Sequence, residues 1–292
     1  MPQLPVPSPG AAARVIVTRP LQDAQHWVQQ LQQGGFAAEA LPLIDIAPAS
    51  DLEAAGRAWN ALGDYAACMF VSGNAVDYFF KQKVPAAQAV HTPAAIKKIA
   101  NDGRSLPPAL RLMAPGPGTV AALLAAGVPA GQIDAPPADA AQFDSEALWA
   151  VVGRRDWQGR RVLVVRGEGQ ESGGVSSGRD WMARQWKAAG AQVDFVGVYQ
   201  RRAPVFTAAQ LERARAASAD GSVWLFSSSE AVANLVGLPA LAGVDWRRAR
   251  AIATHPRIEE AVRAAGWGVV VASRPALKDI RDTLASIESL YP

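Results

Sequence analysis

Cysteine and histidine are scarce in this sequence, which excludes several kinds of chemistry. Among 292 residues there are one cysteine and three histidines. The single cysteine, Cys68, permits no internal disulfide and no cysteine-rich metal site, which fits a reducing compartment. It lies in an apolar run without a basic neighbour, so we interpret it as a buried strand thiol and not as a nucleophile. The histidines, His26, His91 and His255, lack metal-ligand spacing, and no metal is expected.

Long apolar segments and concentrated positive charge are also missing. No apolar stretch reaches the length that crosses a membrane. There are 29 Lys and Arg against 26 Asp and Glu, without the basic stripe that marks a nucleic-acid surface. Residues 1–13 are rich in proline and lack a signal-peptide pattern, so we expect a disordered tail and a cytoplasmic protein. The mildly basic balance suits an acidic small molecule as the ligand.

The sequence does contain a unit that it repeats about six times: a short apolar strand, a turn of small polar residues and the start of a helix. The strands and their turns are residues 15–20, 69–74, 112–119, 163–169, 224–229 and 251–255. Apolar strands that alternate with helices predict parallel sheets covered on both faces. The turns after such strands share one edge of the sheet, where backbone amides, hydroxyls and helix N-termini suit anions. Because the turns hold almost no general acid or base, they predict a site that grips an anion at many points.

Two extended segments, residues 39–48 and 192–200, interrupt this repeat. Three of the strand–turn–helix units lie between them and the others lie outside. We therefore interpret both segments as crossings between two lobes. The sequence predicts a first, discontinuous lobe of residues 14–45 and 203–292, and a second lobe of residues 46–202.

Several short motifs accompany the repeat. In chain order they are Val-Thr-Arg-Pro (17–20), Pro-Leu-Ile (42–44), Phe-Val-Ser-Gly-Asn-Ala-Val (70–76), the turn 116–119, Asp-Ser-Glu-Ala-Leu (144–148), Val-Val-Arg-Gly-Glu-Gly (164–169), Val-Tyr-Gln-Arg (198–201) and Phe-Ser-Ser (226–228). In order and spacing, these motifs resemble the uroporphyrinogen-III synthase family over about residues 14–290.

The resemblance implies an α/β fold of two doubly wound, flavodoxin-like parallel-sheet lobes joined by two extended linker strands, with the first lobe discontinuous. It implies a lyase that cyclises hydroxymethylbilane, a linear tetrapyrrole rich in carboxylates. The reaction loses water and inverts the last pyrrole ring to give uroporphyrinogen III. We expect a monomer without a cofactor and without a nucleic-acid or membrane partner. A pyrrole nitrogen can expel the neighbouring hydroxyl unaided, so the enzyme mainly imposes orientation.

The resemblance also assigns site residues. It places the substrate in a cleft between the two lobes and makes Tyr199 the catalytic residue. Tyr199 lies on the second linker, by which the chain returns to the first lobe. Its phenol is expected to point into the cleft and to donate a hydrogen bond to the departing hydroxyl. The substrate carboxylates are expected at the turns, on Arg19, Ser72, Gly116, Gly118, Thr119, Ser145, Arg166, Gly167, Gly169, Ser227, Ser228 and Thr254. From the sequence alone, Tyr199 is instead a packing tyrosine, which alternation places on the face of Phe195 and Gly197. Arg19 and Arg166 have the alternative role of binding nearby carbonyls.

The chain departs from the family pattern in three places. Residues 170–178 separate Gly169 from Arg179, where family members run Arg-Gly-x-Gly-Gly-Arg without interruption. His255 stands in the last turn, where many members have Gly or Thr. The stretch 84–108 is longer than usual, and we expect it to be a loop, as we do 170–178. The roles of Arg179 and His255 therefore stay open.

Two alternative functions also stay open. Gly116–Ala121 matches Gly-x-Gly-x-x-Ala after a strand, and Asp134 follows at about the spacing of a ribose-binding acid, which would indicate a nucleotide-dependent enzyme. Against this, Pro117 has no N–H to offer a pyrophosphate. The other alternative is a non-catalytic two-lobe binding or sensor protein for a small anionic ligand, with the same turns.

Overall fold

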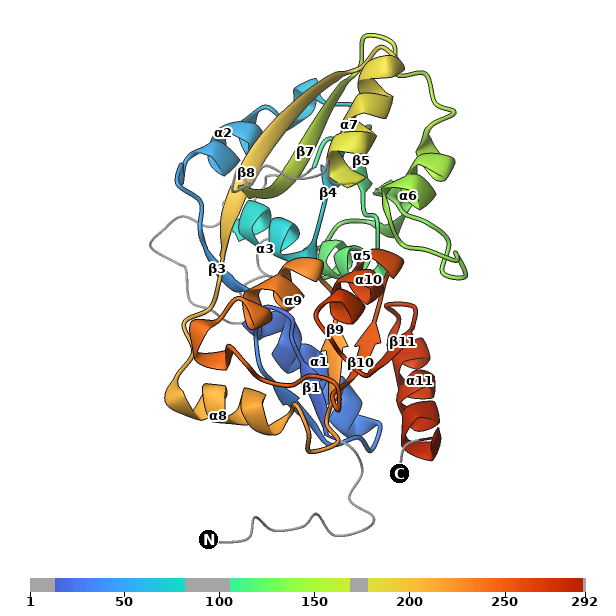
Figure 1. The fold of residues 1–292 in the computed structure, drawn as a ribbon. Coiled ribbons are helices and arrows are strands. Elements are labelled where there is room, and N and C mark those ends of the chain that lie inside the picture. Colours follow the sequence, from blue (N-terminus) through green and yellow to red (C-terminus); the bar gives the residue numbers. More distant parts are fainter. Residues whose placement is uncertain (1–13, 82–105, 169–177, 291–292) are drawn as a thin grey trace, which may run out of the picture. The chain divides into compact units, whose positions relative to one another are not determined.

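The computed structural model describes residues 14–81, 106–168 and 178–290 (Figure 1). The chain divides into two compact units. Unit 1 comprises Met1–Ile46 and Arg202–Pro292, and unit 2 comprises Ala47–Arg201. The expected tail 1–13, nearly all of the expected loop 84–108 and almost all of 170–178 lie outside the described residues. No helix in the described ranges is long and apolar enough to cross a membrane.

Unit 1 is built on a five-stranded sheet with the order β11-β10-β9-β1-β2, in which every neighbouring pair is parallel. The strands are β1 (Val15–Val17), β2 (Ala38–Ala40), β9 (Val223–Phe226), β10 (Arg250–Ala253) and β11 (Val269–Ala272). Numbered along the chain within this unit, the order is 2-1-3-4-5, the flavodoxin-like order that was expected. The strand order changes direction between β1 and β9. This place is the switch point of the sheet, and it lies at the turns that follow these two strands.

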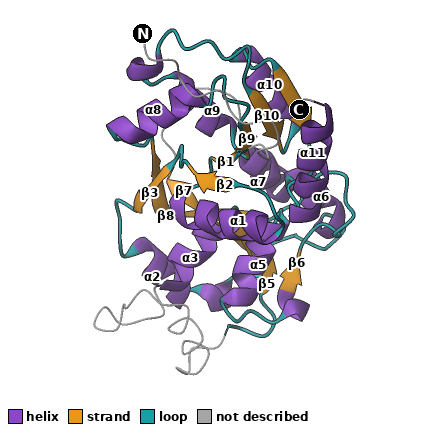
Figure 2. Ribbon diagram, turned by 90° about the horizontal axis from the view of Figure 1, so that it is seen from below, coloured by secondary structure: helices purple, strands orange, loops and turns teal. Residues whose placement is uncertain are grey.

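Helices cover both faces of this sheet (Figure 2). They are α1 (Leu21–Gln33), α8 (Ala208–Ala216), α9 (Ser229–Val236), the 3₁₀ turn η4 (Pro239–Leu241), α10 (Pro256–Ala264) and α11 (Leu277–Leu290). Ile16 and Trp224 pack among α8, α9 and α10 on one face. Val17 and Leu225 pack against α1 and α11 on the other. Two successive residues of a strand are thus buried on opposite faces, which is why these strands are apolar throughout.

Unit 2 is built on a six-stranded sheet with the order β3-β8-β7-β4-β5-β6. The strands are β3 (Asp45–Pro48), β4 (Ala67–Phe70), β5 (Arg111–Met113), β6 (Ile133–Asp134), β7 (Arg161–Glu168) and β8 (Gln192–Arg202). From β4 to β8 the order is 3-2-1-4-5, as in a Rossmann sheet, and all these neighbours are parallel. The order thus differs from the flavodoxin-like one of unit 1, because both β5 and β6 extend the sheet to one side before β7 returns beside β4.

The helices of unit 2 also cover both faces of its sheet. They are α2 (Ala54–Asn60), α3 (Gly73–Lys81), α5 (Pro117–Ala125), α6 (Ser145–Val152) and α7 (Gly178–Ala188), with the 3₁₀ turns η1 (Leu62–Asp64) and η3 (Ala130–Gln132). Met69 and Val164 pack against α6 and α7. On the other face, the Phe70 ring lies 5.5 Å from that of Phe79 in α3. Cys68 is a free, buried thiol in β4, as predicted, and burial raises its pKa.

Candidate functional site

The carboxyl ends of β4, β7 and β8 bring three predicted site residues together in unit 2. Tyr199 of β8 places its hydroxyl oxygen 3.1 Å from the Oγ of Ser72, which follows β4. The same Oγ accepts a hydrogen bond of 3.2 Å from the backbone N of Ala75, in the first turn of α3. The Tyr199 ring is fully buried and lies over Gly167 of β7. This is the switch point between β4 and β7, where doubly wound sheets bind ligands.

A β-bulge in the β7–β8 pair sets the position of Tyr199. Arg166 pairs with Gly197, but the next residue, Gly167, pairs with Tyr199. Val198 is therefore the extra residue of β8. A bulge of this kind re-aims the side chain that follows it.

The bulge makes the prediction from alternation wrong. Phe195 and Tyr199 were expected on one face of the sheet. The guanidinium of Arg166 lies 4.5 Å from the centre of the Phe195 ring and pairs with Asp180 of α7 at 3.6 Å. The Tyr199 ring instead faces Tyr78 of α3, with 5.8 Å between the ring centres. Phe195 thus lies on the face of the sheet where Arg166 pairs with α7, whereas Tyr199 contacts α3 on the other face.

Gly167 has a steric role that is independent of any ligand. A Cβ at this position would lie 2.8 Å from Cε2 and 2.9 Å from Cζ of Tyr199. Such distances are too short for a real carbon contact, so a side chain here would displace the ring. The glycine in the Arg-Gly-Glu motif therefore allows the phenol to lie over β7.

Glu168 joins this group, and sequence reasoning missed it. Its Oε1 accepts hydrogen bonds from the backbone N and the Oγ of Ser50, at 2.7 and 2.8 Å. Its Oε2 accepts one from Nε2 of Gln200, at 2.8 Å. The available signal was an acidic residue at the end of an apolar strand, in a turn otherwise made of small residues. Gly169, the next predicted site residue, lies outside the described part of the chain.

The predicted glycine-rich turn lies at the start of α5. Gly116 is the N-cap residue in an extended conformation, and Pro117 is the first helical residue. A Cβ on Gly118 would meet no atom within 4 Å, so this glycine is not required by packing. Thr119 is buried. The turn follows β5, beside β4, so it shares the sheet edge of Ser72.

Asp134 does not fit the nucleotide alternative. Arg155 donates to its two carboxylate oxygens at 2.6 and 2.7 Å, and Arg111 donates to the same oxygens at 2.6 and 3.1 Å. The side chain of Asp134 is only 6% exposed. A carboxylate that binds two arginines in this way is a structural ion pair and not a ribose acceptor.

Ser145 is the first residue of α6 and is buried. The helix is capped by Asp144, whose Oδ1 accepts a hydrogen bond of 2.8 Å from the backbone N of Ala147. The Asp144 carboxylate thus supplies negative charge at this N-terminus, which disfavours a second anion there.

In unit 1, Arg19 follows β1 at the switch point. Its guanidinium pairs with Asp23 at 2.9 Å and lies 4.6 Å from the centre of the Trp27 ring, both in α1. The residue before it, Thr18, donates a hydrogen bond of 2.7 Å from Oγ1 to the carbonyl of Leu225 and so ties β1 to β9. Within the described ranges, both of these contacts of Arg19 are with side chains of α1 and neither is with a carbonyl.

The other predicted residues of unit 1 follow β9 and β10. Ser227 and Ser228 lie between β9 and α9, and Ser228 is the N-cap residue without a side-chain capping bond. Thr254 is buried, and its hydroxyl donates to the carbonyl of Phe226 at 3.3 Å. These turns are neighbours of the Arg19 turn along the same edge, because β1, β9 and β10 are adjacent.

His255 has a structural role that the sequence left open. It is the N-cap of α10, and its Nδ1 accepts a hydrogen bond of 3.1 Å from the backbone N of Arg257. His26 is exposed on α1, and His91 lies outside the described residues. Within the described ranges, no group of His, Cys, Asp or Glu could hold a metal ion.

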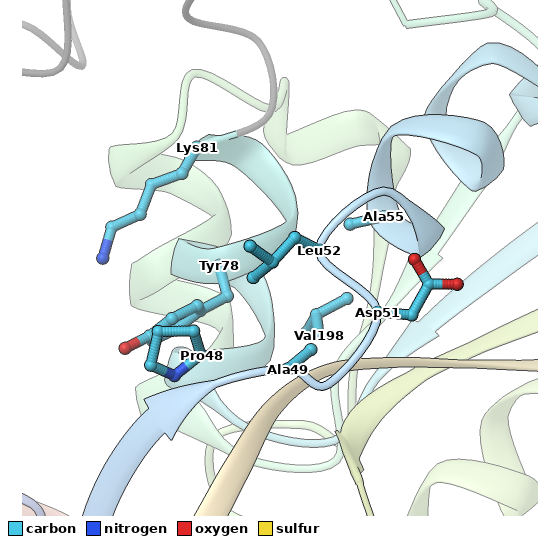
Figure 3. A pocket seen from close by; sticks show the side chains of 8 residues that line it. All are labelled: Pro48, Ala49, Asp51, Leu52, Ala55, Tyr78, Lys81 and Val198. Atoms are coloured by element: carbon cyan, nitrogen blue, oxygen red, sulfur yellow. The ribbon is translucent and has the colours of Figure 1, made fainter. Parts of the chain in front are cut away.

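A cavity of about 200 Å³ lies in unit 2, lined by Val198 and Tyr78, which adjoin Tyr199 (Figure 3). Its walls come from the end of β3, the segment that leads into α2, the first turn of α2, α3 and Val198 of β8. The Nζ of Lys81 lies 4.4 Å from the centre of the Tyr78 ring. Drug-sized ligands occupy roughly 300–1,000 Å³, so this cavity is too small for a whole tetrapyrrole.

The fold and these turns define a class: an α/β protein of two doubly wound units, with small polar residues at the switch point of each sheet. A family model described as uroporphyrinogen-III synthase HemD matches residues 25–281. The chain therefore belongs to the uroporphyrinogen-III synthase family, which confirms the resemblance. Its activity class is that of a cyclising lyase in tetrapyrrole biosynthesis.

Individual relatives agree with this assignment. A protein of Salmonella typhimurium named uroporphyrinogen-III synthase is 28% identical over 255 residues, which cover 87% of this chain and 92% of that protein. A mutant uroporphyrinogen III synthase of the extremely thermophilic bacterium Thermus thermophilus has a similar structure, with a TM-score of 0.52 and 14% identity, covering 96% of this chain and 100% of that chain. The corresponding protein of Helicobacter pylori gives a TM-score of 0.50 and 12% identity over 94% of this chain and 99% of that chain. At such low identities, the two structures show the fold alone.

Proposed function

We propose that this protein converts hydroxymethylbilane to uroporphyrinogen III, with Tyr199 as the catalytic side chain. The observation that supports this role is the placement of the phenol at the switch point of unit 2, within 3.1 Å of Ser72. The electron pair of a pyrrole nitrogen expels the neighbouring hydroxyl group, and the phenol donates a hydrogen bond to the departing oxygen. A phenol keeps its proton at neutral pH, so it can act in this way without being a strong acid.

Because the phenol is buried in this structure, the proposed mechanism requires that it become accessible to the substrate. The ring has no exposed area, and its hydroxyl already has Ser72 as a partner. For the phenol to reach the substrate, the turn between β4 and α3 has to yield, and the departing hydroxyl has to replace Ser72 as the hydrogen-bond partner. Ser72 thus holds the phenol in the free enzyme and releases it in the complex.

The polar turns are the proposed clamp for the substrate carboxylates. In unit 2 the clamp comprises the turns at Ser72 and at Gly116–Thr119. In unit 1 it comprises those at Arg19, at Ser227 with Ser228, and at Thr254. Because each contact is small, the clamp works by orientation, which fixes the ring that is inverted. The protein is proposed to act in the cytoplasm as a monomer, without a nucleic-acid partner.

The test is to supply the purified protein with hydroxymethylbilane, oxidise the product and separate the porphyrin isomers. Type III product is expected, at an undiminished rate in the presence of a chelator. Closure without enzyme gives the uninverted isomer, so type I product alone would contradict the proposed function. That outcome, with a bound ligand, would favour the non-catalytic binding protein.

A further inference from the structure

We infer that Glu168 is a positioning residue, whose carboxylate fixes the bulged end of β8 and through it the phenol of Tyr199. The inference rests on the proposed function of Tyr199. It concerns a residue that does not itself contact the substrate in the proposed mechanism.

The first observation is the span of the carboxylate's hydrogen bonds. Oε1 accepts from the backbone N and the Oγ of Ser50, and Oε2 accepts from Nε2 of Gln200. Ser50 lies just after β3, and Gln200 directly follows Tyr199. One side chain therefore joins β7 to two segments that are far from it in sequence, and one of these carries the phenol.

The second observation is the way in which Glu168 fits the bulge. A Cβ on Gly197 would lie 2.5 Å from the Cγ of Glu168, so the Glu168 side chain occupies the space that Gly197 leaves empty. Past the bulge, Glu168 pairs with Gln200 in the β7–β8 ladder. The side chain thus contacts β8 on both sides of Tyr199.

The third observation is the charge of the group. Partial burial acts to raise the pKa of Glu168, but the hydrogen bonds from Ser50 and Gln200 outweigh it and hold the pKa below its usual value. The group is therefore an ionised acceptor at neutral pH, and hydrogen bonds to an ionised acceptor are shorter and stronger than neutral ones. A glutamine at position 168 keeps the shape of the side chain but replaces one carboxylate oxygen by an NH₂ group. This NH₂ donor then faces the donors of Ser50 or Gln200.

The test compares kcat and KM of Glu168→Gln with the wild type, and repeats the substitution in a Tyr199→Phe background. In the wild-type background kcat should fall by about ten-fold, with KM changed less than two-fold, because ground-state binding is not the affected step. In the Tyr199→Phe background the same substitution should change kcat by less than two-fold. Glu260→Gln, an exposed acid of α10, serves as the control and should leave both constants unchanged.

Gly197→Ala offers a second perturbation that leaves the charge intact. The added methyl group should displace the Glu168 side chain and lower kcat by a similar factor. In a Glu168→Ala background the methyl group has room, and Gly197→Ala should cause no further loss. Ser50→Ala, which removes one of the hydrogen bonds, gives a milder variant should Glu168→Gln fail to fold.

Four outcomes would overturn the inference. An equal loss from Glu168→Gln in both backgrounds would show a structural role that does not act through Tyr199. A raised KM with unchanged kcat in Glu168→Gln would also contradict the inference. The same holds for an equal loss of kcat from Gly197→Ala in the wild-type and the Glu168→Ala backgrounds. Full activity of Tyr199→Phe alone would overturn the proposed role of Tyr199 and, with it, this inference, whereas the other outcomes leave the proposed function standing.

Discussion

At position 167 a side chain and the Tyr199 ring compete for one space. Gly167→Ala would put a carbon within 2.9 Å of two ring atoms, and overpacking of this kind costs about 1–3 kcal/mol of unfolding free energy. In a Tyr199→Ala background the cost should disappear, because the ring is absent. Urea unfolding of the four proteins measures this, with Gly118→Ala, which meets open space, as the control. An equal cost in both backgrounds would show that the ring is not the reason for the glycine.

Asp134 predicts a pH dependence of stability. Burial acts to raise the pKa of its carboxyl, but hydrogen bonds from Arg155 and Arg111 outweigh it and keep the pKa below the unfolded value of about 4. A depressed pKa gives stability that is present above about pH 4 and is lost as the pH falls through the lower folded value. Asp134→Asn should therefore be less stable than the wild type at pH 7, by about 2 kcal/mol. The difference should shrink in unfolding experiments at about pH 3. A difference that stays constant would contradict the ion pairs as its cause.

At the scale of elements, the sequence predicted the strands, the helix starts and the flavodoxin-like strand order of unit 1, but not the different order of unit 2. The interior strands β1, β4 and β9 are buried along their whole length, so each appears as an apolar run whatever its neighbours are. An apolar run does not indicate which strands are its neighbours in the sheet, so it could not predict that β7 pairs with β4 and not with β6. The bulge before Tyr199 was equally hidden, because it depends on how Gly167 and Gly197 pack and not on the local pattern of β8. Family resemblance pointed to Tyr199, but only the packing shows Glu168.

The start of α10 allows a direct test of whether His255 is a cap or an acid. His255→Ala should cost about 1 kcal/mol of stability, as the loss of an N-cap usually does, while His255→Asn should restore most of it. Both folded variants should keep the wild-type kcat. A large loss of kcat in His255→Asn, with stability retained, would mean that the imidazole takes part in the reaction.

The turn after β9 tests the carboxylate clamp. Ser227→Ala removes one hydroxyl of many, so it should weaken transition-state binding by about 1 kcal/mol, or several-fold in kcat/KM. Steady-state kinetics with thermal unfolding as the control for folding measures this. Complete inactivation of a folded Ser227→Ala protein would show a catalytic residue in place of a clamp.

For the whole molecule, the order and spacing of the motifs predicted more than any single motif did. They indicated the family over about residues 14–290, and the family model matches 25–281. The two units have different strand orders, 2-1-3-4-5 and 3-2-1-4-5, yet both place hydroxyl-bearing turns at the point where the order reverses. The position of a switch point depends on the order of all strands in the sheet, so the local sequence pattern of one strand could not predict it.

The central claim is that orientation selects the isomer while the phenol of Tyr199 assists the loss of the hydroxyl group. The most direct measurement is the rate and isomer composition of the product made from hydroxymethylbilane by Tyr199→Phe, beside the wild type. Tyr65→Phe is the matched control, since its hydroxyl binds Asp194 elsewhere in unit 2. The account predicts a rate lower by about ten- to a thousand-fold in Tyr199→Phe, with type III product still formed by the enzyme. Full activity in a folded Tyr199→Phe protein, or a change of its enzymatic product to type I, would contradict it.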